Sequence, residues 1–158
     1  MVSEAMRYNI KGRKYIGADS KYYFEDPGIR NAILGFRQIE NSHMMENVLY
    51  NELCSRGYSV DVGLVEIWEK SADGKNKHKK LEVDYVINRG SQRIYIQSAY
   101  MMLDAEKVAQ EQRPLMKIED SFRKVIISGD YGGKFYSSEG VLRIGVFDFL
   151  FDTNCLDE

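Results

Sequence analysis

Two apolar stretches joined by a short polar turn constrain the fold more than any other feature of the sequence. Residues 81–87 (LEVDYVI) and 93–100 (RIYIQSAY) have the composition and alternation of strands, and the NRGS segment at 88–91 between them is typical of a hairpin. The second stretch is apolar on both faces, which indicates a central strand. We therefore expect a sheet whose inner strands are covered on both sides.

Helical patterns flank this hairpin. Residues 41–57 begin at a capping Asn41 or Ser42, end at Gly57 and carry apolar residues at helical spacing. Residues 103–116 predict a second long helix, which Pro114 should end early. A strand is expected at 58–68 with a bulge at Gly63-Leu64, a hydrophilic turn at 70–80, and strands at 125–128 and 141–146 around a glycine-rich loop. The order predicts an α/β domain with a central mixed β-sheet flanked by helices.

Length and composition limit the organisation and the compartment. The 158 residues fit one domain, expected at 21–158, with residues 1–20 as a lead-in segment or the end of a preceding domain. Two distant cysteines exclude a disulfide scaffold and a cysteine-rich zinc module. No apolar run is long enough for a membrane span, and the net charge of −2 provides no global attraction to nucleic acid or membrane. We expect a cytoplasmic protein without a membrane partner.

Three polar residues occupy positions where apolar ones are expected. Glu46 shares a helix face with Leu49 and Leu53, Asp84 lies within the first hairpin strand, and Gln97 lies within the second. Each has an ordinary alternative, which is a solvated carboxylate for the two acids and a hydrogen-bonded core amide for Gln97.

The hairpin brings two of these residues together if its loop has an even length. With a four-residue loop Asp84 is directly opposite Gln97, and with a two-residue loop the two are diagonal neighbours about 5 to 8 Å apart on one face. A three-residue loop would separate them onto opposite faces. If the helix covers this face, Glu46 joins them, and oxygen ligands of this kind suit Mg²⁺.

Several segments in this order resemble a known family. They are residues 21–31 (KYYFEDPGIRN), 45–53 (MENVLYNEL), 82–86 (EVDYV), 94–100 (IYIQSAY) and 113–115 (RPL). A helix Glu, a strand Asp and a following x-(E/Q)-x-K strand are the signature of the PD-(D/E)XK, restriction-endonuclease-like superfamily. More closely, the segments resemble the C-terminal domain of unknown function attached to bacterial and archaeal AAA-type ATPases.

The resemblance implies roles for individual residues. Glu46 and Asp84 would be metal ligands, with Mg²⁺ as the implied ion, and Gln97 would occupy a ligand position as an uncharged amide. A metal nuclease of this superfamily has lysine where this chain has Ala99, and that lysine positions the attacking water. Lys107 on the following helix is a candidate substitute, although a solvated lysine is the more ordinary interpretation. The sequence therefore favours a degenerate site.

The expected function follows from that degeneracy. The primary hypothesis is a nuclease-like accessory domain of a larger AAA-type ATPase, which recognises DNA or a partner. The alternatives are an active Mg²⁺-dependent DNA endonuclease and a protein-interaction module without a ligand. Residues 129–136 contain glycines and a lysine but not the spacing of a phosphate-binding loop, so we expect no ATP site in this chain. The ATPase part of the parent chain is the expected partner, and the oligomeric state stays open.

Overall fold

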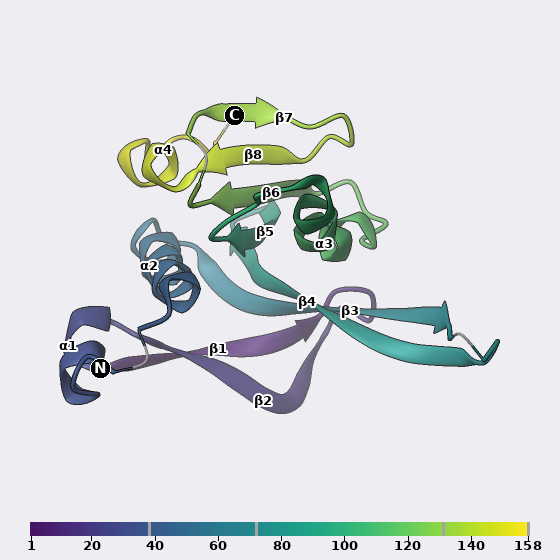
Figure 1. The fold of residues 1–158 in the computed structure, drawn as a ribbon, viewed down its shortest axis with the longest axis horizontal. Helices are drawn as coiled ribbons and strands as arrows, with labels where there is room; N and C mark the ends of the chain where they lie inside the picture. The colour runs from purple at the N-terminus through teal and green to yellow at the C-terminus, as the bar shows by residue number, and fades with distance from the viewer. Residues whose placement is uncertain (38, 72, 131, 158) are drawn as a thin grey trace.

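The strands belong to one large mixed sheet. They are β1 (Val2–Asn9), β2 (Lys14–Phe24), β3 (Ser59–Lys70), β4 (Asn76–Arg89), β5 (Gln92–Ala99), β6 (Arg123–Ser128), β7 (Lys134–Tyr136) and β8 (Leu142–Gly145). A computed structural model describes residues 1–37, 39–71, 73–130 and 132–157, and over these the sheet has eight strands in the order β2-β1-β3-β4-β5-β6-β8-β7 (Figure 1). The pairs β1–β3, β5–β6 and β6–β8 are parallel and the other pairs are antiparallel.

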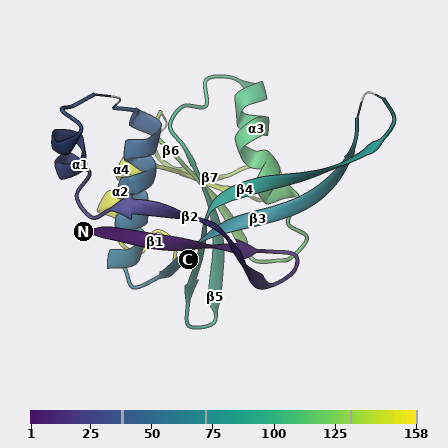
Figure 2. The same cartoon turned by 90° about the horizontal axis from the view of Figure 1, so that it is seen from below.

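Helices cover both faces of the sheet. The chain forms α1 (Pro27–Ile33), α2 (Asn41–Ser55), α3 (Ala105–Met116) and α4 (Val146–Phe151). Helices α2 and α4 pack on one face and α3 on the other (Figure 2). The first core contains Leu49, Leu53 and Phe149, and the second contains Leu115 and Ile126. The α/β class and the mixed sheet flanked by helices, both predicted from the sequence, are confirmed.

Local sequence signals set some of the helix ends, but the cap predicted for α2 at Asn41 or Ser42 is wrong, because Glu40 precedes the helix and no side chain caps it. The Asp26 carboxylate accepts from the backbone N–H of Ile29 at 3.0 Å, which caps α1 in front of Pro27. Gly57 follows α2 with a φ of +81°, as its predicted role as the stop requires. Pro114 was expected to shorten α3, but the helix continues to Met116. The proline lies in the last turn, where the lost hydrogen bond is offset by burial of Pro114 and Leu115.

The first twenty residues belong to the sheet, which the sequence did not indicate. The expected boundary at Lys21 falls inside β2, and β1 lies between β2 and β3. A register shift between Ala5 and Arg7 interrupts the β1–β2 pairing, so the apolar residues of β1 follow no simple period. This irregularity explains why the sequence of the segment showed no clear strand period.

Strands β3 and β4 extend beyond the sheet as a two-stranded projection. The expected hydrophilic turn at 70–80 is shorter than predicted, because β3 continues to Lys70 and β4 starts at Asn76.

The bulge expected at Gly63-Leu64 lies close by, between Asp61 and Gly63, but the extra residue is on β4. A third difference is β7, which forms within the predicted glycine-rich loop. None of the described helices is long and apolar enough to cross a bilayer.

Candidate functional site

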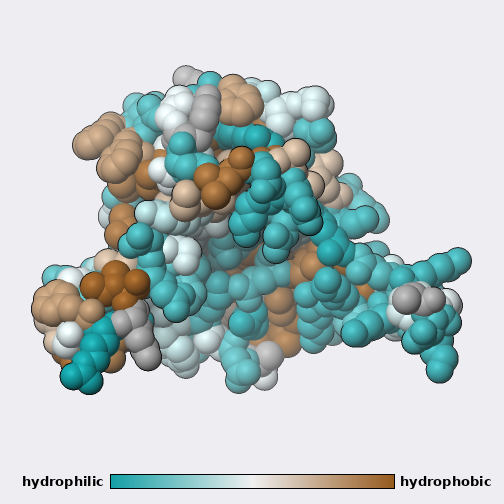
Figure 3. Space-filling model, in the orientation of Figure 1, coloured by the Kyte–Doolittle hydropathy of each residue, from teal (hydrophilic) through white to brown (hydrophobic). Residues whose placement is uncertain are grey.

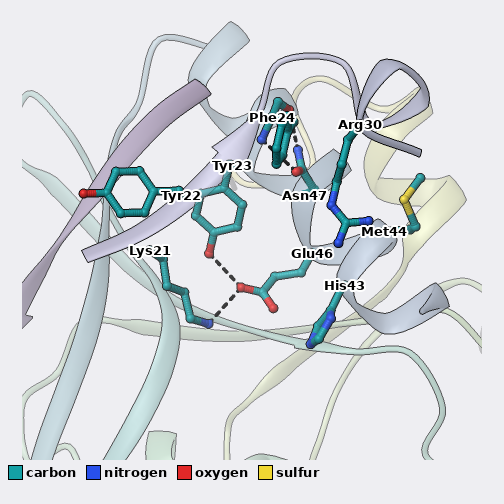
Figure 4. A pocket seen from close by; sticks show the side chains of 9 residues that line it. All are labelled: Lys21, Tyr22, Tyr23, Phe24, Arg30, His43, Met44, Glu46 and Asn47. Atoms are coloured by element: carbon teal, nitrogen blue, oxygen red, sulfur yellow. Dashed lines mark hydrogen bonds and ion pairs between the residues drawn. The ribbon is translucent and has the colours of Figure 1, made fainter. Parts of the chain in front are cut away.

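A lysine lies at the centre of a group of carboxylates on the α2 side of the sheet. Lys21 Nζ is 2.9 Å from Glu46 Oε1, 2.6 Å from Glu82 Oε1 and 3.8 Å from Asp84 Oδ1. The Tyr23 hydroxyl donates to the same Glu46 oxygen at 2.7 Å (Figure 4). We call Lys21, Tyr23, Glu46, Glu82 and Asp84 the acid–lysine cluster.

Strand β2 brings the cation to this face. Lys21 pairs with Ala5 and Tyr23 with Ser3, and residues opposite each other in a pair share a face of the sheet. Ala5 and Tyr23 are both buried in the core under α2, so Lys21 points towards the same helix. Glu46 extends from α2 to meet it, and the helix is held there by the Tyr85 hydroxyl, which donates to the Glu46 carbonyl at 2.7 Å.

A bulge turns Asp84 towards the same helix. Asp61 pairs with Val86 and Gly63 with Val83, so β4 has one more residue than β3 over this stretch. Val83 and Val86 contact the core under α3, whereas Tyr85 belongs to the core under α2. Asp84 lies with Tyr85 on the α2 side, where it approaches Lys21 and accepts from the backbone N–H of Ser98 at 2.8 Å.

Further contacts fix the rim of the cluster. Arg7 Nη1 lies 2.5 Å from Glu82 Oε2, so Glu82 bridges Arg7 and Lys21. Next to the cluster is a pocket of about 320 Å³, open between β2 and the start of α2 (Figure 4). Its lining residues are Lys21, Tyr22, Tyr23, Phe24, Arg30, His43, Met44, Glu46 and Asn47.

The electrostatics follow from burial and from these contacts. Burial, reinforced by the charge of Glu46, raises the pKa of Asp84 well above its usual range, although Lys21 and the Ser98 N–H oppose the shift. Burial lowers the pKa of Lys21, but the charges of Glu46 and Asp84 and the hydrogen bonds to Glu82 and Glu46 outweigh it and raise the pKa overall. Lys21 therefore stays charged, and Asp84 is protonated more readily than an ordinary aspartate.

The structure brings together two of the three acceptor residues expected from the sequence. Glu46 and Asp84 both contact Lys21. Gln97 pairs with Ile126 of β6, which lies in the core under α3, so Gln97 points to the opposite side of the sheet. The hairpin register is one of the two expected from the sequence, with Asn88 paired to Arg93, but the bulge prevents Asp84 from sharing a face with Gln97. Among the described residues, the buried Gln97 Oε1 has no hydrogen-bond partner.

The two positions considered for a lysine are also apart from the cluster. Ala99 is buried in the core under α3, on the side facing away from Glu46. Lys107 Nζ pairs with Glu111 Oε1 at 2.6 Å along α3. The ammonium beside the acids comes instead from Lys21, which sequence reasoning did not select. The signal that could have found it is the pair Lys21 and Tyr23 on one face of a short strand at the start of the first family-like segment.

These side chains do not fit a resident Mg²⁺ ion. Magnesium needs carboxylate oxygens free to face the ion, and here those oxygens face the ammonium of Lys21. Over the described part of the chain, no group of three or more His, Cys, Asp and Glu side chains is arranged to hold a metal. The cluster is best described as a partly buried ion-pair network beside an open pocket.

Comparison with known proteins finds a longer relative but assigns no activity. No family model matches it, and no solved structure matches it. An uncharacterized protein of Haemophilus influenzae is 30% identical over 150 residues, which cover 93% of this chain and 32% of the relative. The chain thus spans about a third of the length of the curated relative it matches.

Proposed function

We propose that this chain is a nuclease-like α/β module that recognises nucleic acid or a partner chain and does not cleave DNA itself. The support is the order of Glu46 on a helix, Asp84 on a strand and Gln97 on the next strand, within a mixed sheet flanked by helices. The observation that carries the proposal is the ammonium of Lys21, which lies among the acids that would otherwise bind a metal.

The chemistry of phosphodiester hydrolysis explains why this observation matters. A metal nuclease needs a cation that can polarise a phosphate and generate a hydroxide from bound water. The charge of the Lys21 ammonium is engaged by Glu46, Glu82 and Asp84, and an ammonium has no bound water whose pKa it could lower, so it generates no hydroxide. Ala99, buried on the other side of the sheet, cannot supply the missing group.

A larger parent protein fits this supporting role. The relative from Haemophilus influenzae is about three times as long as the matched region. Together with the resemblance to domains attached to AAA-type ATPases, this length supports an accessory module in a longer chain. The ATPase part would then provide the energy-dependent step, and this module would provide recognition.

Plasmid cleavage tests the proposal. Supercoiled plasmid is incubated with the protein and Mg²⁺ or Mn²⁺, and Asp84→Asn is run in parallel. We expect no nicking by either protein. Nicking by the unmodified chain that disappears in Asp84→Asn would overturn the proposal in favour of the endonuclease.

A second experiment tests the role of Lys21 directly. Replacing Lys21 by Met removes the ammonium and leaves three carboxylates close together, which is strongly unfavourable unless a cation compensates. We expect Mn²⁺ to raise the melting temperature of Lys21→Met and to leave the unmodified protein unchanged. Lys14→Met, at an exposed position of the same strand, is the matched control. Equal stabilisation of all three proteins by Mn²⁺ would contradict the neutralising role of Lys21.

A further inference from the structure

The projection formed by β3 and β4 extends away from the rest of the sheet (Figure 1). We define the β3–β4 arm as residues 66–71 and 73–80, which extend away from the sheet in Figure 1 and form a hydrophilic projection in Figure 3. Residues 66–80 contain five lysines and three acids in a chain whose net charge is −2. Positive charge is therefore concentrated on the arm, and the rest of the chain is acidic.

The strand register gives the arm two different faces. Glu66 pairs with Lys80, Trp68 with His78 and Lys70 with Asn76, and these pairs alternate with those of Ile67 and Glu69. Ile67 packs against the core under α3, and Glu69 forms an ion pair with Arg113 of that helix. The second face is thus fixed to the body of the protein.

The first face combines aromatic and charged side chains, and its one acid, Glu66, lies opposite Lys80 and 3.8 Å from His78 Nε2. Trp68 is 71% exposed, and its ring lies 4.9 Å from the ring of His78. Lys70 and Lys80 lie on either side of this aromatic pair on the same face, and both are exposed. A large exposed aromatic ring next to cations is a combination that binds bases and phosphates together.

We propose that this face of the β3–β4 arm binds single-stranded nucleic acid, with a base stacked on Trp68 and phosphates paired with Lys70 and Lys80. A duplex is a poorer ligand, because its bases already stack on one another. An acidic peptide would pair with the lysines but would leave Trp68 without a partner of matching shape. The inference names the ligand of the proposed recognition function and rests on it, but it does not involve the acid–lysine cluster.

The single tryptophan of the chain reports on its own site. Trp68 is that residue, so stacking of a base should quench the intrinsic fluorescence of the intact protein. The probe is a short oligothymidylate, titrated at several salt concentrations. We expect quenching and an affinity that falls steeply as salt rises, since phosphate contacts release counterions.

Two variants and a control locate the contact. Trp68→Ala should weaken binding about tenfold, as expected for the loss of one stacked base. Binding is measured by the anisotropy of labelled oligothymidylate. The double variant Lys70→Gln and Lys80→Gln should reduce the slope of log affinity against log salt by about 1.4, which is about 0.7 for each lost phosphate contact. The control replaces two exposed lysines by Gln, Lys11 in the β1–β2 turn and Lys14 at the start of β2, and should bind like the unmodified protein.

The outcomes separate this inference from the proposed function. Binding that is indifferent to the arm variants overturns the arm as the site and leaves recognition elsewhere intact. Absence of quenching, or equally tight binding of duplex, polyglutamate or phosphatidylserine vesicles, overturns the single-strand ligand. Metal-dependent nicking that is lost in Asp84→Asn overturns the proposal that the chain does not cleave DNA. It leaves the inference about the β3–β4 arm intact.

Discussion

The side chain of Asn47 satisfies both backbone groups of Phe24. Its Oδ1 accepts from the Phe24 N–H at 2.9 Å, and its Nδ2 donates to the Phe24 carbonyl at 2.6 Å. This pair fixes the end of β2 to α2, which positions Lys21 and Tyr23 against Glu46. We expect Asn47→Ala to lower the free energy of unfolding by about 1–3 kcal/mol in urea titrations, because the Phe24 N–H loses its partner and the Phe24 carbonyl keeps the bond from Asn51 Nδ2 at 2.9 Å. Asn41→Ala, at the exposed start of α2, should change the free energy of unfolding little. Equal effects of the two substitutions would contradict the role of Asn47 in fixing β2 to α2.

The Tyr23 hydroxyl is expected to contribute through its bond to Glu46. Tyr23→Phe removes the 2.7 Å hydrogen bond to a charged oxygen and keeps the ring, which stacks on Tyr50. Thermal and urea unfolding should show a loss of about 1.5–3 kcal/mol, the range for hydrogen bonds to charged groups. Tyr22→Phe provides the control, since Tyr22 is 63% exposed on the neighbouring position. A loss no larger in Tyr23→Phe than in Tyr22→Phe would argue against the contact.

Stability should depend on the ionisation of Asp84. Burial and the charge of Glu46 raise its pKa to about 7 in the folded state, against an ordinary value near 4. Between these values the folded protein binds more protons than the unfolded chain, so this group makes stability fall as pH rises, by at most about 1.4 kcal/mol per pH unit. Asp84→Asn cannot titrate, and its stability relative to the unmodified protein should be greater at pH 8 than at pH 5. A pH-independent difference would refute the assignment.

Glu82 should show the opposite dependence. Burial raises its pKa, but the hydrogen bonds and charges of Lys21 and Arg7 outweigh burial and lower the pKa overall. Its contribution to stability is therefore present above the ordinary glutamate pKa and is lost as pH falls below it. Glu82→Gln should be less stable than the unmodified protein at neutral pH, and the deficit should shrink in acid. Urea titrations that extend from pH 8 to below about pH 4 test both residues together.

A lysine at position 99 should not restore a nuclease site. Ala99 is 3% exposed in the core under α3, so Ala99→Lys places an ammonium among apolar side chains such as Leu115 and Ile126. We expect a loss of several kcal/mol in unfolding experiments and no plasmid nicking with Mg²⁺. Ala109→Lys, on the exposed side of α3, is the control and should leave stability nearly unchanged. Metal-dependent nicking by Ala99→Lys would show that this position does face the acids.

The sequence predicted the parts of this fold that depend on local patterns. The hairpin of β4 and β5 and the end of α2 at Gly57 follow from turn chemistry and periodicity. The bulge in β4 could not be located in the same way, because it depends on how β3 pairs across the sheet. It decides which side of the sheet Asp84 occupies, and so it separated Asp84 from Gln97.

Lys21 was missed for a related reason. Its partners Glu46, Glu82 and Asp84 lie between 25 and 63 positions further along the chain, and no periodic pattern connects them. A lysine in a mostly polar segment is ordinarily solvated, and only the position of β2 beyond β1 at the edge of the sheet changes that expectation. The candidate acids could be selected from the sequence, but their counter-ion could not.

The place of β1 in the sheet also determines when the acid–lysine cluster can assemble. β1 pairs in parallel with β3, from Arg7 to Val62, across more than fifty intervening residues, and Lys21 reaches Glu46 only when β2 is held beside β1. Distant parallel pairings form slowly, since a long loop must close before any contact compensates for it. During refolding, we therefore expect the β4–β5 hairpin to form early. The contacts of Lys21 with the three acids should form among the last native contacts, and until then the acids repel one another.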